Sequence, residues 1–279
     1  MTAEYVDSHA HLWDLDRRDQ GWIGVDSPIR RNFGVDDLRA ATAPTPISRV
    51  VLVQVINDEA ETWDFLECSA REELVAGVVG WTDIAAPNVS DKLGELVATG
   101  HLVAIRHQLL AEPDPIVWLQ RSDVHRGLAE LARSNLVFDL LIRSEHFAAA
   151  IDVVRAHSSL QFVLNHIGKA PIAAGKLEPW ATGLRQLAAE PNVACKLSGM
   201  MTIAKMNSWT YDDIRPFAEV VVEAFGPSRL MFGSDWPVST QAASYGEVFE
   251  VTQLICSQLS ESERDDVLRG TARTIYGVR

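Results

Sequence analysis

Residues 136–167 read LVFDLLIRSEHFAAAIDVVRAHSSLQFVLNHI, and they contain the pattern on which the architecture of this chain rests. The runs at 136–142 and 161–167 are short and apolar, which is typical of buried strands. The stretch between them, 145–158, carries apolar residues at helical spacing. Two buried strands joined by one amphipathic helix predict a βαβ unit with parallel strands.

The same alternation runs through the rest of the chain. Further strand patterns lie at 4–10, 49–55, 74–81, 102–108, 193–199 and 229–235. Further helical patterns lie at 59–73, 89–99, 124–134, 178–190, 214–226, 247–259 and 262–277. Eight strand–helix units favour an α/β fold, a closed (β/α)8 TIM barrel, over an open doubly wound sheet. No linker interrupts them, so we expect one domain over residues 1–279.

Composition excludes several classes of protein. The chain has 279 residues, enough for a barrel of about 250. Its net charge of −13, without any basic run, excludes nucleic-acid binding. No apolar run approaches the roughly 20 residues of a membrane span, and the N-terminus lacks the pattern of a signal peptide. Three scattered cysteines predict reduced thiols and a cytoplasmic protein, and homo-oligomerisation is compatible with the sequence.

The segment Asp7-Ser8-His9-Ala10-His11 ends the first strand pattern. Residues two apart on a strand point to the same face, so His9 and His11 would aim both imidazoles at one spot. Two such nitrogens can bind a metal ion or a water molecule. The alternative is a pair of histidines placed in a loop by chance.

Three more strand patterns end in polar residues. The pattern at 102–108 ends in Arg106-His107-Gln108, and the pattern at 161–167 contains Asn165-His166. The last one reaches Asp235, which Trp236 and Pro237 follow. Active sites of TIM barrels lie at the C-terminal ends of the strands. Because ionisable groups are rarely buried without a partner or a function, the convergence of four such ends predicts an active site.

These segments resemble, in chain order, the motifs of the amidohydrolase superfamily. The matching stretches are DSHAHLW, VLVQV, GWTDI, IRH, VLNHIGKAPI, KLSG and MFGSDWPV. The branch is the sugar-lactonase-like one, with enzymes of the L-fuconolactonase, L-rhamnonolactonase and sulfomuconolactonase types. The resemblance implies a (β/α)8 barrel, lactone hydrolysis and a site built from His9, His11, His166 and Asp235, without fixing the substrate.

The sequence departs from the superfamily at two ligand positions. Two-metal members use a lysine at the end of the fourth strand, where this chain reads IRHQ at 105–108. Many one-metal members use a histidine at the end of the fifth strand, whereas His146 lies beyond that strand, in the expected helix. A two-metal centre is therefore not expected. One Zn²⁺ on His9, His11 and Asp235 and a metal-independent site both remain open.

Each site residue has a functional and a structural interpretation. Asp235 is expected to act as general base and then as general acid, and its alternative role is to cap the following helix. His166 would ligate a metal or orient the substrate, or else be a core histidine bonded to a carbonyl. Of Arg106 and His107 only one can face the barrel interior, and we expect it to be Arg106.

Further substrate contacts are expected at the rim. The proposed substrate-binding residues are Arg106, His107, Lys169, Trp13, Trp81 and Trp236. A tryptophan face stacks well on a sugar ring, although packing between loops would explain each tryptophan equally well. Two long connections at 12–36 and 199–213 are expected to cover the barrel mouth. Asp139, inside a strand, is expected to pair with Arg106 or Lys196 as a structural ion pair.

The resulting hypothesis is lactone hydrolysis by direct attack of water. No G-x-S-x-G motif occurs, which disfavours a covalent serine route. The expected partner is a small lactone. Two alternatives stay open: a non-oxidative decarboxylase of an aromatic or unsaturated acid on the same barrel, and a non-catalytic sugar-binding barrel.

Overall fold

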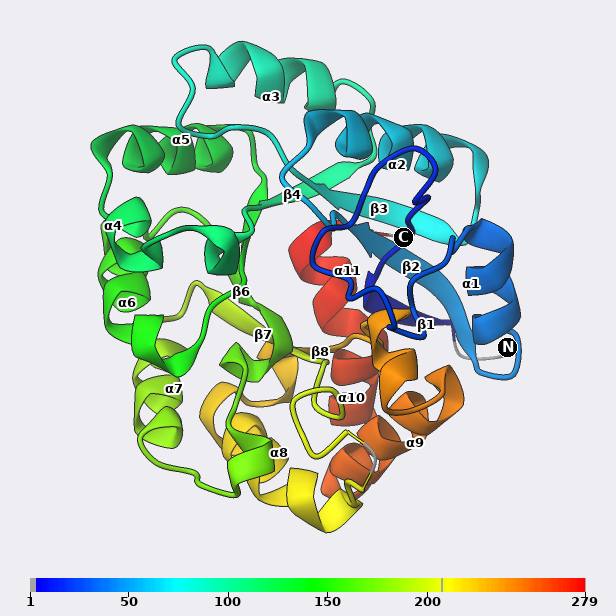
Figure 1. The fold of residues 1–279 in the computed structure, drawn as a ribbon. Coiled ribbons are helices and arrows are strands. Elements are labelled where there is room, and N and C mark those ends of the chain that lie inside the picture. The colour runs from blue at the N-terminus through cyan, green and yellow to red at the C-terminus, as the bar shows by residue number, and fades with distance from the viewer. Residues whose placement is uncertain (1–3, 207, 279) are drawn as a thin grey trace.

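The computed structural model describes residues 4–206 and 208–278 and contains one eight-stranded parallel sheet (Figure 1). The strands pair in chain order. They are β1 Tyr5–Ala10, β2 Ile47–Val53, β3 Val75–Gly80, β4 Leu102–Arg106, β5 Val137–Leu140, β6 Phe162–Leu164, β7 Val193–Leu197 and β8 Leu230–Phe232. Backbone hydrogen bonds from the His11 N–H to the Trp236 carbonyl and from the Asp235 N–H to the His9 carbonyl join the first strand to the segment after the last strand. The predicted (β/α)8 TIM barrel is confirmed.

Helices surround the sheet and cover its outer face (Figure 1). They are α1 Val35–Thr42, α2 Glu59–Arg71, α3 Val89–Val97, α4 Pro115–Leu119, α5 Ser122–Arg133, α6 Phe147–Ala156, α7 Trp180–Ala188, α8 Tyr211–Phe225, α9 Tyr245–Ile255, α10 Glu261–Asp265 and α11 Thr271–Tyr276. Two of them, α1 and α4, were not predicted. The helix predicted at 262–277 is interrupted between α10 and α11 by a π-helical turn, Asp266–Gly270.

Each strand contributes to two apolar layers because alternate residues point to opposite faces. In β2, Val50 and Leu52 belong to the cluster between sheet and helices, whereas Val51 and Val53 belong to a cluster inside the barrel. The inner cluster also contains Tyr276 from the C-terminal segment. The interior is therefore packed near the chain termini and leaves the other end for polar residues.

Seven of the eight strands end before their apolar patterns do, whereas β1 ends at Ala10, as predicted. β6 ends at Leu164 because His166 and Ile167 adopt left-handed backbone angles, with φ of 53° and 48°. His146 lies in a 3₁₀ turn, Ser144–His146, before α6 and not inside that helix. His166 and Asp235 thus stand beyond the ends of β6 and β8, at the barrel mouth. His9 and Arg106 lie inside β1 and β4, close to their C-terminal ends.

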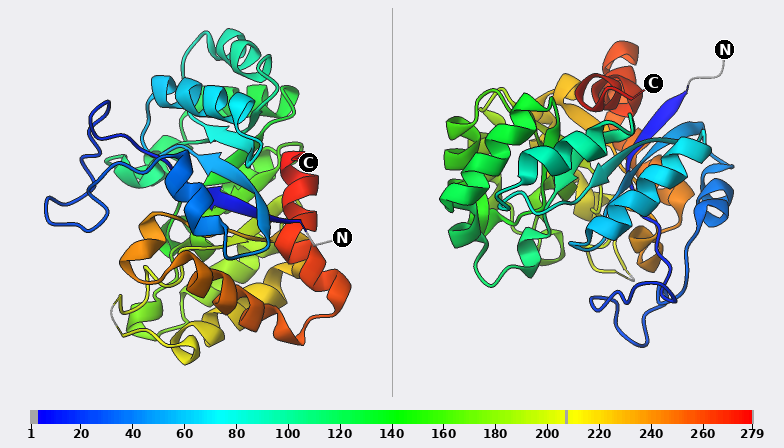
Figure 2. Two further views of the ribbon diagram at one scale, coloured as in Figure 1. Left: turned by 90° about the vertical axis from the view of Figure 1, so that its right-hand side faces the viewer. Right: turned by 90° about the horizontal axis from the view of Figure 1, so that it is seen from above.

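The connection between β1 and α1, dark blue in Figure 2, stands out from the barrel at the end opposite to the chain termini. Its Trp22 is 47% exposed and lines the cavity at the mouth. The connection at 199–213 contributes no residue to that cavity among the residues that the structure describes. Within the described ranges, the helices are too short or too polar for any of them to cross a membrane.

Substitution of Gly127 tests the close packing of α5. A Cβ atom at Gly127 would lie 2.0 Å from the Ile84 carbonyl oxygen, which follows β3. We expect Gly127→Ala to lower the free energy of unfolding by about 2–3 kcal/mol, as overpacking does. Gly94→Ala in α3 is the control, because its Cβ meets nothing within 4 Å and Ala favours a helix by about 0.5–1 kcal/mol. Urea unfolding compares them, and equal stability of the two variants would contradict the packing argument.

Candidate active site

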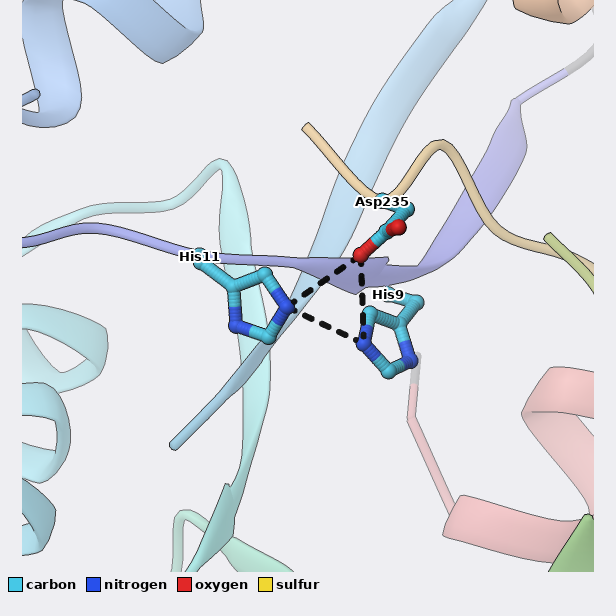
Figure 3. Close-up of side chains that lie close together, drawn as sticks. All are labelled: His9, His11 and Asp235. Atoms are coloured by element: carbon cyan, nitrogen blue, oxygen red, sulfur yellow. Dashed lines mark hydrogen bonds and ion pairs between the residues drawn. The ribbon is translucent and has the colours of Figure 1, made fainter. Parts of the chain in front are cut away.

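Three imidazoles surround the Asp235 carboxylate at the barrel mouth, and Figure 3 shows two of them, His9 and His11. Asp235 Oδ1 lies 3.4 Å from His11 Nε2 and 3.8 Å from Nε2 of His9. It lies 3.8 Å from His166 Nε2 as well. All four side chains are buried, although they come from the two ends of the chain and from its middle. The residues that the sequence singled out for catalysis therefore form one cluster.

Unusual backbone conformations aim two of these side chains. Asp235 has φ of 57°, and its N–H donates to the His9 carbonyl over 2.8 Å. The backbone of His166 is also in the left-handed conformation, and its Nδ1 lies 2.8 Å from Ser198 Oγ. Gly199 passes so close that a Cβ there would lie 2.8 Å from His166 Nδ1. Left-handed angles are costly for non-glycine residues and are often found at functional sites, where the surrounding structure holds them.

Protein groups fix the protonation of His11. Its Nδ1 lies 2.7 Å from the carbonyl oxygen of Val53. A carbonyl only accepts, so Nδ1 carries the ring proton and donates it. In the neutral ring, Nε2 is then an acceptor, and it lies 3.1 Å from His9 Nε2 and 3.4 Å from Asp235 Oδ1. Burial lowers the pKa of His11, which favours this neutral form.

His9 is held differently, because each ring nitrogen faces a cationic donor. Lys196 Nζ lies 3.2 Å from Nδ1, and Arg106 Nη1 lies 3.3 Å from Nε2. Neither cation can accept a hydrogen bond. Burial, followed by the charge of Lys196, lowers the pKa of His9 well below its usual value. Neutral His9 therefore places its single bare nitrogen against a positive charge, whichever tautomer is present.

A buried polar network lies beneath the cluster and supports His9. Lys196 Nζ donates to Asp139 Oδ2 over 2.7 Å, and neither side chain has solvent exposure. Asn165 Nδ2 donates to the same oxygen over 2.9 Å. The Tyr276 hydroxyl of α11 donates to Asp139 Oδ1 over 2.7 Å. The expected ion pair of Asp139 therefore forms with Lys196.

Arg106 points into the barrel and His107 points away from it. The Arg106 guanidinium donates to the backbone and side-chain oxygens of Gln54 and, over 3.2 Å, to Asn165 Oδ1. Its buried Nε has no partner among the described residues. Burial lowers its pKa to about 10, so it stays cationic at neutral pH. His107 stacks on Trp118 at a centroid distance of 4.2 Å.

Asp235 is ionised at neutral pH despite its burial. Burial raises the pKa of Asp235, and positive charge around the carboxylate, from His166 and His11 when they are protonated and from Lys169, lowers that pKa to about 2. Burial lowers the pKa of His166 well below its usual value. The cluster at neutral pH is therefore one carboxylate among neutral imidazoles.

The His9, His11 and Asp235 donors suit a metal in distance but only partly in chemistry. Their ligand atoms all lie within 4.8 Å of one another, a separation that one divalent ion can bridge. Asp235 offers a free lone pair, and His11 offers the bare Nε2 that lies 3.1 Å from His9 Nε2. The bare nitrogen of His9 instead faces Lys196 or Arg106, and a bound cation would meet those positive charges. The site thus supplies two ready ligands and a third that the protein already occupies.

A cavity of about 520 Å³ opens above the cluster. It is lined by His11, Trp22, Val55, Ile56, Asn57, Arg106, Gln108, Leu110, Ala111, Leu141, Arg143, His166, Lys169, Asp235 and Val238. Lys169, Arg106 and His166 thus share one space with Asp235, and His9 lies directly beneath. The volume suits a small organic molecule.

The three tryptophans expected at the rim do not line this cavity. Trp13 is buried and packs edge-on against Phe33, and Trp236 packs against the same ring. Trp81 donates from Nε1 to Nδ1 of His107, which also lies outside the cavity. Trp22, from the long connection after β1, is the tryptophan found in the lining. A position just after a strand predicted proximity to the mouth but not the direction of the side chain.

Sequence reasoning also missed four polar or aromatic lining residues, Trp22, Asn57, Gln108 and Arg143. Asn57 and Arg143 follow β2 and β5 by a few residues, so the rule that sites collect at strand ends could have found them. Gln108 stood inside the predicted strand and received no role. Nothing in the sequence distinguished Trp22 from the rest of its loop.

A parallel barrel with His-x-His at the end of β1, a buried aspartate after β8 and a cavity at the mouth has the arrangement of a TIM-barrel hydrolase. Comparison with known proteins agrees with this class. Residues 6–278 match the model of the amidohydrolase family, and the chain belongs to this family.

Two relatives and one solved structure illustrate the similarity. The L-fucono-1,5-lactonase of Burkholderia multivorans is 34% identical over 289 residues, spanning 100% of this chain and 97% of that protein. The 4-sulfomuconolactone hydrolase of Rhizobium radiobacter is 37% identical over 84 residues, 30% of this chain and 27% of that protein. The crystal structure of a B. multivorans amidohydrolase with bound zinc has a TM-score of 0.95 and 34% identity, covering 99% of this chain and 100% of that one.

Removal of Lys196 tests the buried network. Lys196→Met leaves the Asp139 carboxylate buried without its cation, and we expect a loss of about 3–5 kcal/mol in the free energy of unfolding. The double variant Asp139→Asn/Lys196→Met should recover most of that loss, because neither charge of the pair is then left without the other. Urea unfolding measures both. A double variant as unstable as Lys196→Met would show that the pair does not act through its charges.

Proposed function

We propose that this protein is a lactonase that opens the ring ester of a small lactone, in the first instance a sugar lactone, by direct attack of water. The observation that carries the proposal is the ionised Asp235 carboxylate, with Oδ1 within 3.8 Å of three imidazole nitrogens at the floor of the cavity. The names of the relatives, which act on a sugar lactone and on a sulfonated lactone, support the same reaction class.

Asp235 and His11 together bind the attacking water. The bare Nε2 of His11, which also lies 3.1 Å from His9 Nε2, is 3.4 Å from the Asp235 carboxylate, and both groups accept hydrogen bonds. A water molecule that donates one hydrogen to each is oriented with its oxygen lone pair toward the cavity. Asp235 removes a proton as the water oxygen bonds to the lactone carbonyl carbon, which is general base catalysis.

Cationic donors stabilise the oxyanion that forms on the carbonyl oxygen. Arg106 is held rigidly by Gln54 and Asn165, and its charge persists at neutral pH. Such fixed donors in a desolvated site stabilise developing negative charge strongly. When the intermediate collapses, the bond between carbonyl carbon and ring oxygen breaks, and protonated Asp235 gives its proton to the leaving ring oxygen. The product acid releases its own proton to solvent.

A covalent route through a serine lacks a nucleophile in the cavity. Of the described residues that line it, none is Ser, Thr or Cys. Ser198 lies 2.8 Å from His166 Nδ1 but is 1% exposed and stands outside the lining. We therefore assign Ser198 to orienting His166. Direct hydrolysis needs only the carboxylate, the imidazoles and the guanidinium that the cavity presents.

Substitution of Asp235 tests the acid–base role. Asp235→Asn keeps the shape of the side chain and removes its basicity, so we expect kcat to fall by about 10²–10⁴-fold with KM changed little. The measurement is steady-state lactone hydrolysis by pH indicator. Asp152→Asn, an exposed carboxylate of α6, is the control and should behave as wild type. Near-normal turnover by Asp235→Asn would rule out this assignment.

Metal removal tests whether the third ligand position matters. Because Lys196 and Arg106 face the nitrogens of His9, we propose that hydrolysis does not depend on a bound ion. The protein is dialysed against a chelator, and its metal content is checked by elemental analysis. We expect kcat to stay within about twofold of its original value, whereas loss of a catalytic metal, which lowers the barrier by several kcal/mol, would reduce kcat by orders of magnitude. Loss of activity that zinc restores would show that His9, His11 and Asp235 bind a working metal.

A further inference from the structure

We propose that the substrate is a lactone carrying a second acidic group, which Lys169 and Arg143 bind at the rim of the cavity. This inference rests on the proposed lactonase function and deepens it by naming the substrate class. It comes from the distribution of charge around the cavity.

Cations follow three neighbouring strands on one side of the barrel. Arg106 ends β4, Arg143 follows β5 and Lys169 follows β6, and all three line the same cavity. His11 and Asp235 come from the opposite part of the barrel, at β1 and β8. The cavity thus has one wall that activates water and another that is cationic.

None of these three cations forms a salt bridge with a described carboxylate. Within the described ranges, no carboxylate oxygen lies within 4.0 Å of any of them, although the chain carries a net charge of −13. Arginines on the outer surface, such as Arg39 and Arg155, do pair with carboxylates. Asp235 is the single carboxylate among the described lining residues. The cavity therefore carries an excess of positive charge in an acidic protein.

Burial makes that excess unfavourable in the absence of an anion. Lys169 is only partly exposed, and burial, together with the charges of Arg106 and Arg143, lowers its pKa despite the opposing effect of Asp235. A cation removed from water is stabilised by a paired, hydrogen-bonded anion. A bound carboxylate, sulfonate or phosphate group beside Lys169 and Arg143 would provide that partner.

The two rim cations, Lys169 and Arg143, differ from Arg106 in their hydrogen-bond partners. Arg106 donates to Gln54 and Asn165 and lies at the level of His9, where the ester carbonyl reacts. For Lys169 and Arg143, no side-chain hydrogen bond to a described residue is found. They are therefore free to bind the part of the substrate away from the ester. Trp22 and Leu141 supply apolar surface to the same cavity, against which the lactone ring can lie.

The test uses two lactones that differ in one group. D-Galactaro-1,4-lactone carries a carboxylate where D-galactono-1,4-lactone carries a hydroxymethyl group. We expect the wild type to hydrolyse the acidic lactone with a kcat/KM at least about tenfold higher, and Lys169→Gln or Arg143→Gln to reduce that value by about 10- to 100-fold, mainly through KM. Arg143→Gln, which is not one of the charges acting on the pKa of Asp235, should change the value for the neutral lactone by less than about threefold, as expected of a remote contact.

Matched controls separate the possible outcomes. Arg155→Gln removes one charge from the last turn of α6 and should leave kcat/KM unchanged for both lactones. Arg143 is exposed, so its variant should fold even if the Lys169 variant does not. Equal losses for both lactones, or a wild type that does not prefer the acidic one, would overturn the acidic subsite and leave lactone hydrolysis standing.

If the wild type hydrolyses neither lactone, a binding measurement still decides. Calorimetry with galactarate and galactonate compares the open-chain diacid with its monoacid. Tighter binding of the diacid that disappears in Arg143→Gln supports the subsite even where the proposed lactonase function fails. Equal affinity for the two acids overturns the subsite.

Discussion

The pairing of the first strand with the last is the constraint on which both the barrel and its site depend. The Asp235 N–H donates to the His9 carbonyl, and the His11 N–H donates to the Trp236 carbonyl over 2.7 Å. Asp7 reinforces this seam, because its carboxylate accepts from the backbone of Ser234 over 2.9 Å. Closure of the sheet and assembly of the carboxylate–imidazole cluster are therefore one event, which links residues more than 200 positions apart in the chain.

Much of this arrangement could be predicted from the sequence. Strands buried on both faces are continuous apolar runs, and all eight were located because each run is bounded by polar residues. The catalytic cluster followed from one rule, that sites of parallel barrels lie at strand ends. His9, His11 and Asp235 obeyed it, although β8 itself ends at Phe232, before Asp235.

The directions of side chains beyond the strands could not be predicted. His166 and Asp235 reach the cluster through left-handed backbone angles that no local pattern requires of non-glycine residues. Trp13 and Trp236 turn toward Phe33, whereas Trp22 reaches the cavity from an irregular loop. Loop geometry depends on contacts between segments distant in sequence, which periodicity does not record.

The net charge of the side chains inside the barrel changes along the barrel axis, from the apolar end toward the mouth. Below lies the apolar inner cluster, and above it the pair of Lys196 and Asp139 is neutral overall. At the next level, the negative charge of Asp235 balances that of Arg106, so the reacting layer is also neutral. Lys169 and Arg143 stand at the rim without such a balance. The potential therefore becomes positive toward the mouth, and low-dielectric walls focus it there. Such a field draws an anion to the rim and orients the uncharged ester of the same molecule toward the water-activating carboxylate.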